Sequence, residues 1–352
     1  MGLPRSKYVE EGKEGVYHCF SRCVRRAFLY GYDALTGRDF SHRKAWLVER
    51  LRRLAGIFSV EVCAYSVMEN HYHVIVRTCP ERVVGWSDEE VARRWLTLFP
   101  RSWDRKGRGK GGIEERIRAL ASNPERVGKL RKRLSSLSWF MGRLNEYMAR
   151  AANREDEVKG RFWESRFKCQ ALLDEAAMVA CMVYVDLNPI RAGRAGTPEE
   201  SEFTSIRERI LGWQKEQVAA SGDSEGGRAE EGSGEGMDPG NFWLCPISSG
   251  RQGGGILSMS TGEYIDLVDK SGRMMRTDKR GAIEADLAPI LIRIGAKPER
   301  WMETVSGFGD QFSLVAGLVL NLRNYAEHFG RRWFRGIAAS RAAFELPPTQ
   351  PA

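Results

Sequence analysis

Two strand-like runs joined by a very short turn constrain the fold of this chain more than any other feature of its sequence. The stretch VEVCAYSVMENHYHVIVRT, residues 60–78, is rich in β-branched and aromatic residues on both sides of a turn at 69–70. Strands joined by so short a turn pair as an antiparallel hairpin. Because successive side chains of a strand point to opposite faces, His71 and His73 lie on one side of the second strand and Tyr72 lies on the other.

The runs around the hairpin follow the order of a ferredoxin-like domain. Residues 15–24 read as a strand, and residues 42–58 place leucines at helical spacing with arginines on the other faces. Residues 137–155 repeat apolar side chains as one stripe of an amphipathic helix. This order predicts an α+β fold with a ferredoxin-like antiparallel sheet and helices on one face. The pattern does not place the last strand.

Composition divides the chain into unequal parts. Between Ser221 and Gly240 lie seven glycines and six acidic residues against one arginine, too little apolar area to offset the entropy of ordering. The expected parts are a first domain over 1–217 with a basic insertion at about 80–135, a flexible linker over 218–240 and a C-terminal domain over 241–352. The C-terminal domain is predicted to be smaller and mostly helical, with a strand-like run at 262–273 and helix-like runs at 287–295 and 312–330.

The positive charge of the chain is concentrated in one segment. The net charge is +9 with a pI near 9.2, and residues 101–135 carry twelve Lys and Arg against four Asp and Glu. This segment is tethered at both ends, between the hairpin and the helix at 137–155, so one interpretation is an electrostatic cradle for DNA. Arg131, Lys132 and Arg133 would then contact phosphates. The other interpretation is a solvated charged excursion.

The remaining composition argues against several protein classes. The first fifteen residues contain no apolar stretch that could act as a signal peptide, and no run of about 18 apolar residues could span a bilayer. The seven cysteines are scattered, and the close pair Cys19 and Cys23 has no second pair to complete a tetrahedral zinc site. We therefore expect a cytoplasmic protein with reduced thiols.

The paired histidines are the strongest chemical signal in the sequence. Two neutral imidazoles side by side can share one divalent cation and leave coordination positions open. Open positions are what a cation needs if it is to polarise a substrate oxygen. The alternative is a histidine pair that is hydrogen-bonded to its neighbours and binds no metal.

Four motifs together resemble one protein family. They are GVYHCFSRC, SVMENHYHVIVR, GRFWESRFK at 160–168 and YVDLNPIRAG at 184–193. Over roughly 16–193 the chain resembles the REP-associated (RAYT) branch of the HUH single-tyrosine transposases. Two positions depart from the usual signature, Tyr72 in place of an aliphatic residue and Glu69 in place of proline, and neither change moves a ligand. The C-terminal domain resembles the extension of longer members of that branch.

The resemblance implies a site and a reaction. His71 and His73 would hold a divalent metal ion, Mg or Mn, and a helix would present a tyrosine to a scissile phosphate of single-stranded, hairpin-containing DNA. The tyrosinate would attack phosphorus, form a phosphotyrosine link and release a free 3′-hydroxyl. Because the link retains the free energy of the phosphodiester, a second 3′-hydroxyl can displace the tyrosine and rejoin DNA without ATP.

Tyr147 is the candidate nucleophile, because it lies at the edge of the apolar stripe of its helix. The family often adds a polar metal ligand one turn later, where this chain has Ala151, and Asn153 stands about 120° round the helix from Tyr147. If Asn153 is the family's asparagine, the tyrosine position falls at Met148 or Ala149 and the nucleophile is missing.

Three further points of the site are left open by the sequence. Tyr184 is the reserve nucleophile. Water can fill the third metal position. A homodimer could supply the tyrosine in trans.

The two later motifs supply candidate contacts to DNA. Arg161, Arg166 and Lys168 suit phosphate contacts. The aromatic residues between them suit stacking on unpaired bases, although core aromatics with charged neighbours fit the pattern equally well. The Asn188-Pro189 step should end a helix, and Arg191 belongs either to this structural motif or to the phosphate contacts.

The sequence therefore predicts a transposase that cleaves and transfers single-stranded DNA with a divalent metal and a tyrosine. The alternative from the binding-protein class is a hairpin DNA-binding protein of the same fold that no longer cuts. A replication-initiator or relaxase relative with the same chemistry is a third interpretation.

Overall fold

The computed structural model describes residues 3–24, 31–33, 37–99, 112–221, 243–248, 255–276 and 286–346. The chain forms two compact units. Unit 1 comprises Met1–Val62, Glu69–His71 and Val76–Ala171, and unit 2 comprises Cys63–Met68, Tyr72–Ile75 and Leu172–Ala352. None of the helices in the described part of the chain is long and apolar enough to cross a membrane. All seven cysteines are buried as free thiols.

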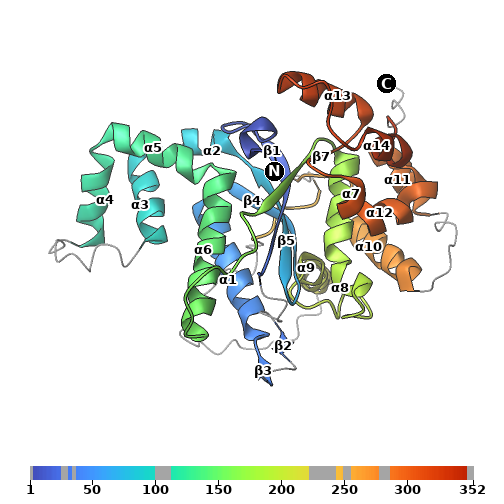
Figure 1. The fold of residues 1–352 in the computed structure, drawn as a ribbon, viewed down its shortest axis with the longest axis horizontal. Coiled ribbons are helices and arrows are strands. Elements are labelled where there is room, and N and C mark those ends of the chain that lie inside the picture. Colours follow the sequence, from blue (N-terminus) through green and yellow to red (C-terminus); the bar gives the residue numbers. More distant parts are fainter. Residues whose placement is uncertain are drawn as a thin grey trace. The chain divides into compact units, whose positions relative to one another are not determined.

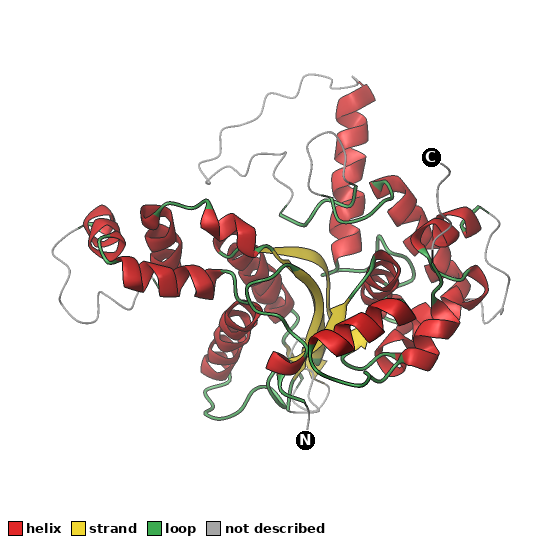
Figure 2. Ribbon diagram, turned by 90° about the horizontal axis from the view of Figure 1, so that it is seen from above, coloured by secondary structure: helices red, strands yellow, loops and turns green. Residues whose placement is uncertain are grey.

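A five-stranded sheet confirms the predicted α+β fold (Figures 1 and 2). Its strands, in the spatial order β4-β5-β1-β6-β7, are β4 Val60–Val67, β5 His71–Thr78, β1 Gly15–Arg22, β6 Lys168–Leu172 and β7 Val315–Ala316. The first four follow the order of a ferredoxin-like sheet. β6 is the strand that the sequence pattern did not place. A separate two-stranded ribbon pairs β2 Tyr32–Asp33 with β3 Arg38–Asp39.

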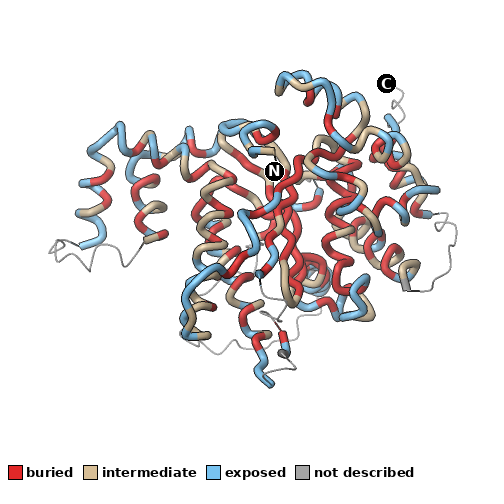
Figure 3. The backbone as a smooth tube through the Cα atoms, in the orientation of Figure 1, coloured by how far each residue is buried: buried red, intermediate tan, exposed pale blue. Residues whose placement is uncertain are grey.

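Helices α1 His42–Ile57 and α6 Leu137–Glu155 of unit 1 form where the apolar periodicity predicted them. Ser136 begins α6, and its hydroxyl accepts a hydrogen bond from the Trp139 N–H. The two helices pack against each other through their apolar stripes, which are buried (Figure 3). This pairing determines which side chains of the two helices face the solvent.

A buried arginine joins the start of α1 to the end of α6. The Arg43 side chain is fully buried and is paired with Glu155 and Asp156. Its guanidinium carbon lies 4.2 Å from the centroid of the Phe40 ring. A buried cation is tolerated here because two carboxylates neutralise it.

The chain between β5 and α6 forms a group of short helices in unit 1 (Figures 1 and 2). They are α2 Pro80–Val84, α3 Asp88–Leu98, α4 Ile113–Ala121 and α5 Pro124–Leu134. A separate 3-10 helix, η1 Arg5–Lys7, lies near the start of the chain. The side chains of Ser87 and Asn123 cap α3 and α5. Residues 112–135 of the basic segment are therefore mainly helical, and residues 101–111 lie outside the described part of the chain.

Unit 2 is mostly helical, as predicted for the C-terminal part of the chain. Its helices are α7 Glu175–Asp186, α8 Asn188–Arg191, α9 Ser205–Ser221, α10 Thr261–Arg276, α11 Ala288–Ile294, α12 Trp301–Gln311, α13 Val319–His328 and α14 Ile337–Ala343, with 3-10 helix η3 Pro298–Arg300. The predicted break at Asn188-Pro189 is confirmed, because α7 ends at Asp186 and proline opens α8.

Two predictions for the C-terminal domain were wrong in detail. Residues 262–273 were expected to form a strand and instead form most of α10, because Tyr264, Leu267 and Val268 are buried at helical spacing. The run 312–330 contains α13 but begins with β7, whose Ala316 carbonyl accepts a hydrogen bond from the Leu173 N–H at 2.9 Å.

The predicted linker is only partly within the described part of the chain. Residues 218–221 continue α9, and residues 222–242 lie outside it. The division into domains at 217 and 241 therefore stays a prediction.

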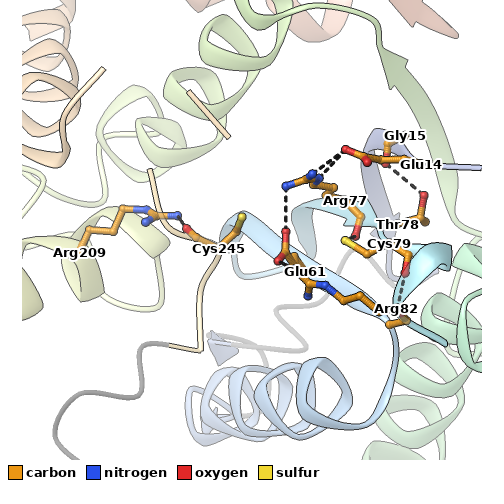
Figure 4. A network of polar contacts seen from close by, with 10 residues as sticks. Glu14, Gly15, Glu61, Arg77, Thr78, Cys79, Arg82, Arg209 and Cys245 are labelled. Carbon is orange, nitrogen blue, oxygen red and sulfur yellow. Dashed lines mark hydrogen bonds and ion pairs between the residues drawn. The ribbon is translucent and has the colours of Figure 1, made fainter. Parts of the chain in front are cut away.

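A buried carboxylate connects three elements of unit 2. Asp186, at the end of α7, accepts hydrogen bonds from the Ser205 hydroxyl at 2.5 Å, the Ile206 N–H at 3.0 Å and the Tyr264 hydroxyl at 2.6 Å. Nearby, Arg209 donates to the carbonyl oxygens of Cys63 at 2.7 Å and Cys245 at 2.9 Å, and the second bond is drawn in Figure 4. Burial raises the pKa of Asp186 to about 6, against the opposing effect of these hydrogen bonds.

The raised pKa of Asp186 predicts a pH-dependent contribution to stability. The folded protein binds this proton more tightly than the unfolded chain, so the Asp186 contribution to the free energy of unfolding should fall as the pH rises from about 4 to about 6. Asp186→Asn should remove that contribution. Urea unfolding of both proteins across this range measures it as the difference between their free energies of unfolding.

The prediction concerns the difference between the two free energies of unfolding, because the effect of His18 on stability changes with pH in the opposite direction. Burial lowers the pKa of His18 to about 4, so its contribution to stability rises with pH over an overlapping range. His18 is present in both proteins and cancels in the difference. Parallel curves for Asp186→Asn and the wild type would contradict the prediction.

Candidate DNA-contacting site

His71 lies at the start of β5, directly after the hairpin turn. Its Nδ1 is 2.6 Å from Oδ1 of Asn70, and the side chain is half-buried. Because an amide oxygen can only accept a hydrogen bond, Nδ1 of His71 carries the proton in this contact.

The neighbour of His71 on the next strand is a cation. The N–H of Cys23 donates to the carbonyl oxygen of Asn70 at 2.9 Å, and the Thr78 hydroxyl at the other end of β5 contacts the carbonyl oxygen of Gly15. β1 and β5 are therefore antiparallel, and the same register places Arg22 opposite His71. Side chains that lie opposite each other share a face of the sheet. The Arg22 side chain is 60% exposed.

His73, the second predicted metal ligand, belongs to unit 2 and is more enclosed than His71. It is 5% exposed, and its ring meets the Tyr184 ring edge-on at a centroid distance of 5.7 Å. Alternation along β5 keeps His71 and His73 on one side of the strand, as the sequence predicted.

Two imidazoles on one side of a strand are ligand types that a divalent cation with open coordination positions can take. Within the described ranges, no group of three or more His, Cys, Asp and Glu side chains is arranged to hold a metal ion. Metal ligation by His71 and His73 therefore stays a prediction.

Tyr147, the candidate nucleophile, emerges on the side of α6 that faces α1. Its side chain is 41% exposed, and the Arg50 guanidinium carbon lies 4.9 Å from its ring centroid. Among the described residues, the contact with Arg50 is the one ring or polar contact of the Tyr147 side chain. The Tyr147 hydroxyl is therefore not hydrogen-bonded to either histidine. This position neither supports nor contradicts the assignment of Tyr147 as the nucleophile, which stays a prediction.

The neighbours of Tyr147 on α6 have other roles. Met148 is fully buried in the core. The Asn153 side chain donates to the carbonyl oxygen of Gly160 at 2.9 Å, which fixes the chain after the helix. Asn145, which the sequence analysis did not single out, donates to the Ser21 hydroxyl at 3.0 Å and accepts from the Trp163 indole at 2.9 Å through its carbonyl.

The motif GRFWESRFK separates into buried rings and exposed cations. The aromatic side chains Phe162, Trp163 and Phe167 are buried, so they belong to the core and do not offer stacking surfaces for bases. Arg161, Arg166 and Lys168 are all exposed, and their contact with phosphates stays a prediction. The Lys168 ammonium lies 5.6 Å from the centroid of the Phe20 ring on β1.

This loop also lies beside Arg22. The N–H of Glu164 donates to the Arg22 carbonyl oxygen at 2.9 Å, and the side chains of these two residues are 4.0 Å apart. The loop that carries these exposed cations is therefore joined to the end of β1, where Arg22 lies opposite His71. We name Arg22, Arg161, Arg166 and Lys168 the cationic rim.

The opposite end of β5 is electrically neutral by comparison. Arg77 is bonded to Glu14 at 2.7 Å and lies 3.5 Å from Glu61, which also pairs with Arg82 (Figure 4). These cations are satisfied by carboxylates and offer little to a phosphate. The contrast places the attractive field for an anion at the His71 end of the strand.

The three candidate residues of α5 have different surroundings. Arg131 donates to the Val83 carbonyl and to Asp88 at 2.7 Å, so its guanidinium holds α5 against the segments before it. Lys132 is exposed, and Arg133 lies over the Trp139 ring at 4.5 Å. Lys132 and Arg133 are free to meet a phosphate, whereas Arg131 is engaged in packing.

The motif YVDLNPIRAG has a structural role in unit 2. Arg191 donates to the Ser306 carbonyl at 3.0 Å and to the Asn188 side chain at 3.2 Å, and lies 4.1 Å from the centroid of the Tyr184 ring. This favours the structural interpretation of Arg191. A Cβ at Gly309 would be 2.7 Å from the Tyr184 hydroxyl, so this glycine makes room for the tyrosine.

Comparison with known proteins gives one distant likeness. No family model and no curated protein matches the chain. Among solved structures, the chain is similar to one described as a REP-associated tyrosine transposase bound to a REP hairpin, with 13% sequence identity and a TM-score of 0.35. The match covers 68% of this chain and 99% of that chain. At this TM-score the likeness carries no argument about this chain, and no residue role is taken from it.

Proposed function

We propose that the protein binds DNA that carries unpaired nucleotides, such as a hairpin with single-stranded flanks, through unit 1. The observation that carries this proposal is the cationic rim beside His71. Its members are exposed, and Glu164 is the carboxylate next to it. Exposed arginines and lysines gathered at one end of a sheet suit contacts to successive phosphates, which position a strand without reading its bases.

A charge-removal experiment tests the DNA-binding proposal. The triple variant Arg161→Ala, Arg166→Ala and Lys168→Ala should bind every DNA sequence more weakly. Each phosphate contact to a single strand contributes roughly 0.7 to the slope of log affinity against log salt, so the slope should flatten by about 2. Fluorescence anisotropy of a labelled hairpin with single-stranded flanks, titrated at several salt concentrations, measures both effects.

A matched control separates the rim from the total charge. Arg323, Arg332 and Arg335 are exposed cations of unit 2 whose replacement by alanine removes the same charge. The control variant should keep the wild-type slope. Equal slopes for the wild type and the rim variant would overturn the proposed contacts, and failure of the wild-type protein to bind any DNA would overturn the proposed function.

A second candidate function, metal-dependent cleavage and strand transfer, is favoured by the position of His71 and His73 on one side of β5. His71 and His73 would hold the cation, with water as a third ligand, and Mn²⁺ suits two nitrogen ligands better than Mg²⁺, which prefers oxygen. A bound divalent cation would neutralise charge on the scissile phosphate. The tyrosine oxygen would form a bond to phosphorus as the bond from phosphorus to the 3′-oxygen breaks, and the 3′-oxygen would take a proton.

The two candidates differ in one observable product. Incubation of the protein with a hairpin oligonucleotide and Mn²⁺ or Mg²⁺, followed by denaturing electrophoresis, detects a covalent protein-DNA adduct. An adduct supports strand transfer. Binding without an adduct supports the non-cleaving alternative.

A further inference from the structure

Three aromatic rings and two guanidinium groups from α3, α5, α6 and the residue after α3 meet around Trp139. The Trp95 ring centroid lies 5.1 Å from that of Phe99 and 5.6 Å from that of Trp139. The Arg133 guanidinium lies 4.5 Å from the Trp139 ring, and that of Arg143 lies 5.4 Å from the same ring. All five side chains are half-buried, so part of each remains open to solvent.

The same surface continues onto α1. Arg53 donates to the Thr97 carbonyl of α3 at 3.4 Å, and Arg50 covers the Tyr147 ring of α6. Burial lowers the pKa of Arg50, and the charges of Arg53 and Arg143 lower it further, against the opposing effect of Tyr147 and Glu146. We name the surface formed by Arg50, Trp95, Phe99, Arg133, Trp139 and Arg143 the aromatic-arginine face.

The charge of this face is poorly compensated within the described part of the chain. Glu146 pairs with Arg143 at 2.7 Å and with Arg150 at 2.7 Å. Arg50, Arg53 and Arg133 form no ion pair with a described carboxylate.

Some other cations of the same helices do have carboxylate partners. Arg93 pairs with Glu114, and Lys129 pairs with Glu125. The uncompensated cations of the aromatic-arginine face favour an anionic partner.

The geometry of the stacked arginines suits a phosphate. A guanidinium whose face lies on an indole ring keeps its N–H groups at its edges, and these are the groups that bind phosphate oxygens in pairs. Stacking also limits the rotamers of the side chain, so less conformational entropy is lost when a phosphate binds.

The rings supply the second half of the recognition. Partly exposed aromatic rings interleaved with cations are the pattern of proteins that bind single strands, because unpaired bases stack on the rings while cations follow the phosphates. The bases of a duplex are stacked on each other and cannot use such rings. An acidic protein segment would satisfy the charges but would leave the indole surfaces without a planar partner.

We propose that the aromatic-arginine face binds a single-stranded segment of DNA, with unpaired bases stacked on Trp95 and Trp139 and phosphates contacted by Arg133 and Arg143. The inference rests on the proposed DNA-binding function and adds a surface distinct from the cationic rim. The aromatic-arginine face would distinguish single-stranded from double-stranded DNA, because it needs unpaired bases. The cationic rim needs phosphates alone.

The test compares single-stranded with fully paired DNA. Trp139→Ala should weaken binding of a labelled single-stranded oligonucleotide by roughly 5- to 150-fold, the range for the loss of one base stack, and should change binding of a blunt duplex by less than about twofold. Trp139→Phe keeps a ring and should recover most of the affinity. Trp333→Ala removes an indole that is 61% exposed in unit 2 and serves as the matched control.

A second variant guards against loss of packing at Trp139. Arg133→Ala leaves the three rings in place and should flatten the salt slope for single-stranded DNA by about 0.7. Circular dichroism and the midpoint of thermal unfolding establish that each variant is folded. Any variant that does not fold is set aside, and Arg133→Ala alone then decides the test.

Each outcome separates this inference from the proposed function. If the wild type binds DNA and Trp139→Ala and Arg133→Ala bind single strands as the wild type does, the inference is wrong and the proposed function stands. If the wild type binds no DNA, both fail. If polyglutamate competes as strongly as single-stranded DNA at equal charge and loses affinity in the same variants, the face binds acidic protein segments and the inference is overturned.

Discussion

Replacing His71 by alanine is expected to abolish divalent-metal-dependent cleavage of a hairpin oligonucleotide while leaving most of the affinity for that DNA. The reason is that cleavage depends on one position, whereas the affinity for DNA depends on many contacts. The imidazole of His71 would act at one phosphate through the cation, whereas the contacts that hold the DNA are spread over the cations of the rim and of the aromatic-arginine face. Loss of one neutral imidazole therefore removes the chemistry and hardly changes the charge that holds the strand.

Two measurements check the His71 prediction. Denaturing electrophoresis follows the cleaved product and the adduct, and calorimetric titration with Mn²⁺ in the absence of DNA follows metal binding directly. Both signals should disappear in His71→Ala. His328→Ala, at an exposed position at the end of α13, should retain both. Cleavage at the wild-type rate by His71→Ala would show that this imidazole does not hold the cation.

Tyr147→Phe is expected to eliminate the covalent adduct completely and to change the free energy of unfolding by less than about 0.5 kcal/mol. The substitution removes only the phenolic oxygen, which is the atom that would bond to phosphorus. The aromatic ring, and with it the contact to Arg50, is kept. Since the hydroxyl makes no hydrogen bond to a described residue, its loss leaves no buried partner unsatisfied.

Tyr184→Phe provides the comparison for the nucleophile. Tyr184 packs against His73 and lies beneath Arg191. Removal of its phenolic oxygen by Tyr184→Phe should therefore leave the adduct intact. An adduct that persists in Tyr147→Phe would assign the nucleophile elsewhere, and mass spectrometry of the linked peptide would identify it. A wild-type protein that binds hairpins and forms no adduct with either metal would establish the non-cleaving alternative.

Periodicity was enough to predict the elements that position the site. α6 begins at Leu137 and ends at Glu155, as its apolar stripe indicated, and the hairpin of β4 and β5 turns where Glu69 and Asn70 interrupt the apolar runs. These features are local, because a repeat of 3.6 or 2 residues is written in consecutive side chains. The same logic misassigned residues 262–273, where β-branched residues resemble a strand although the buried positions repeat at helical spacing.

The partners of charged and aromatic side chains were not predictable in this way. Arg131 and Arg133 are two residues apart and looked equivalent, yet one is bonded to Asp88 and the other stacks on Trp139. Trp95 and Trp139, which carry the further inference, gave no signal in the sequence beyond being aromatic. Their proximity arises from tertiary packing, because the two rings belong to helices that are distant in the chain.

The sequence by itself determined the order of β1, α1, β4, β5 and α6, the position of both histidines on one side of β5 and the excess of positive charge. The tertiary structure alone decided which cations are neutralised, which rings are buried and which remain open. The physical reason is that backbone periodicity depends on neighbours within one turn or one strand. Burial and charge compensation depend instead on residues that are distant in the chain and that only packing brings together.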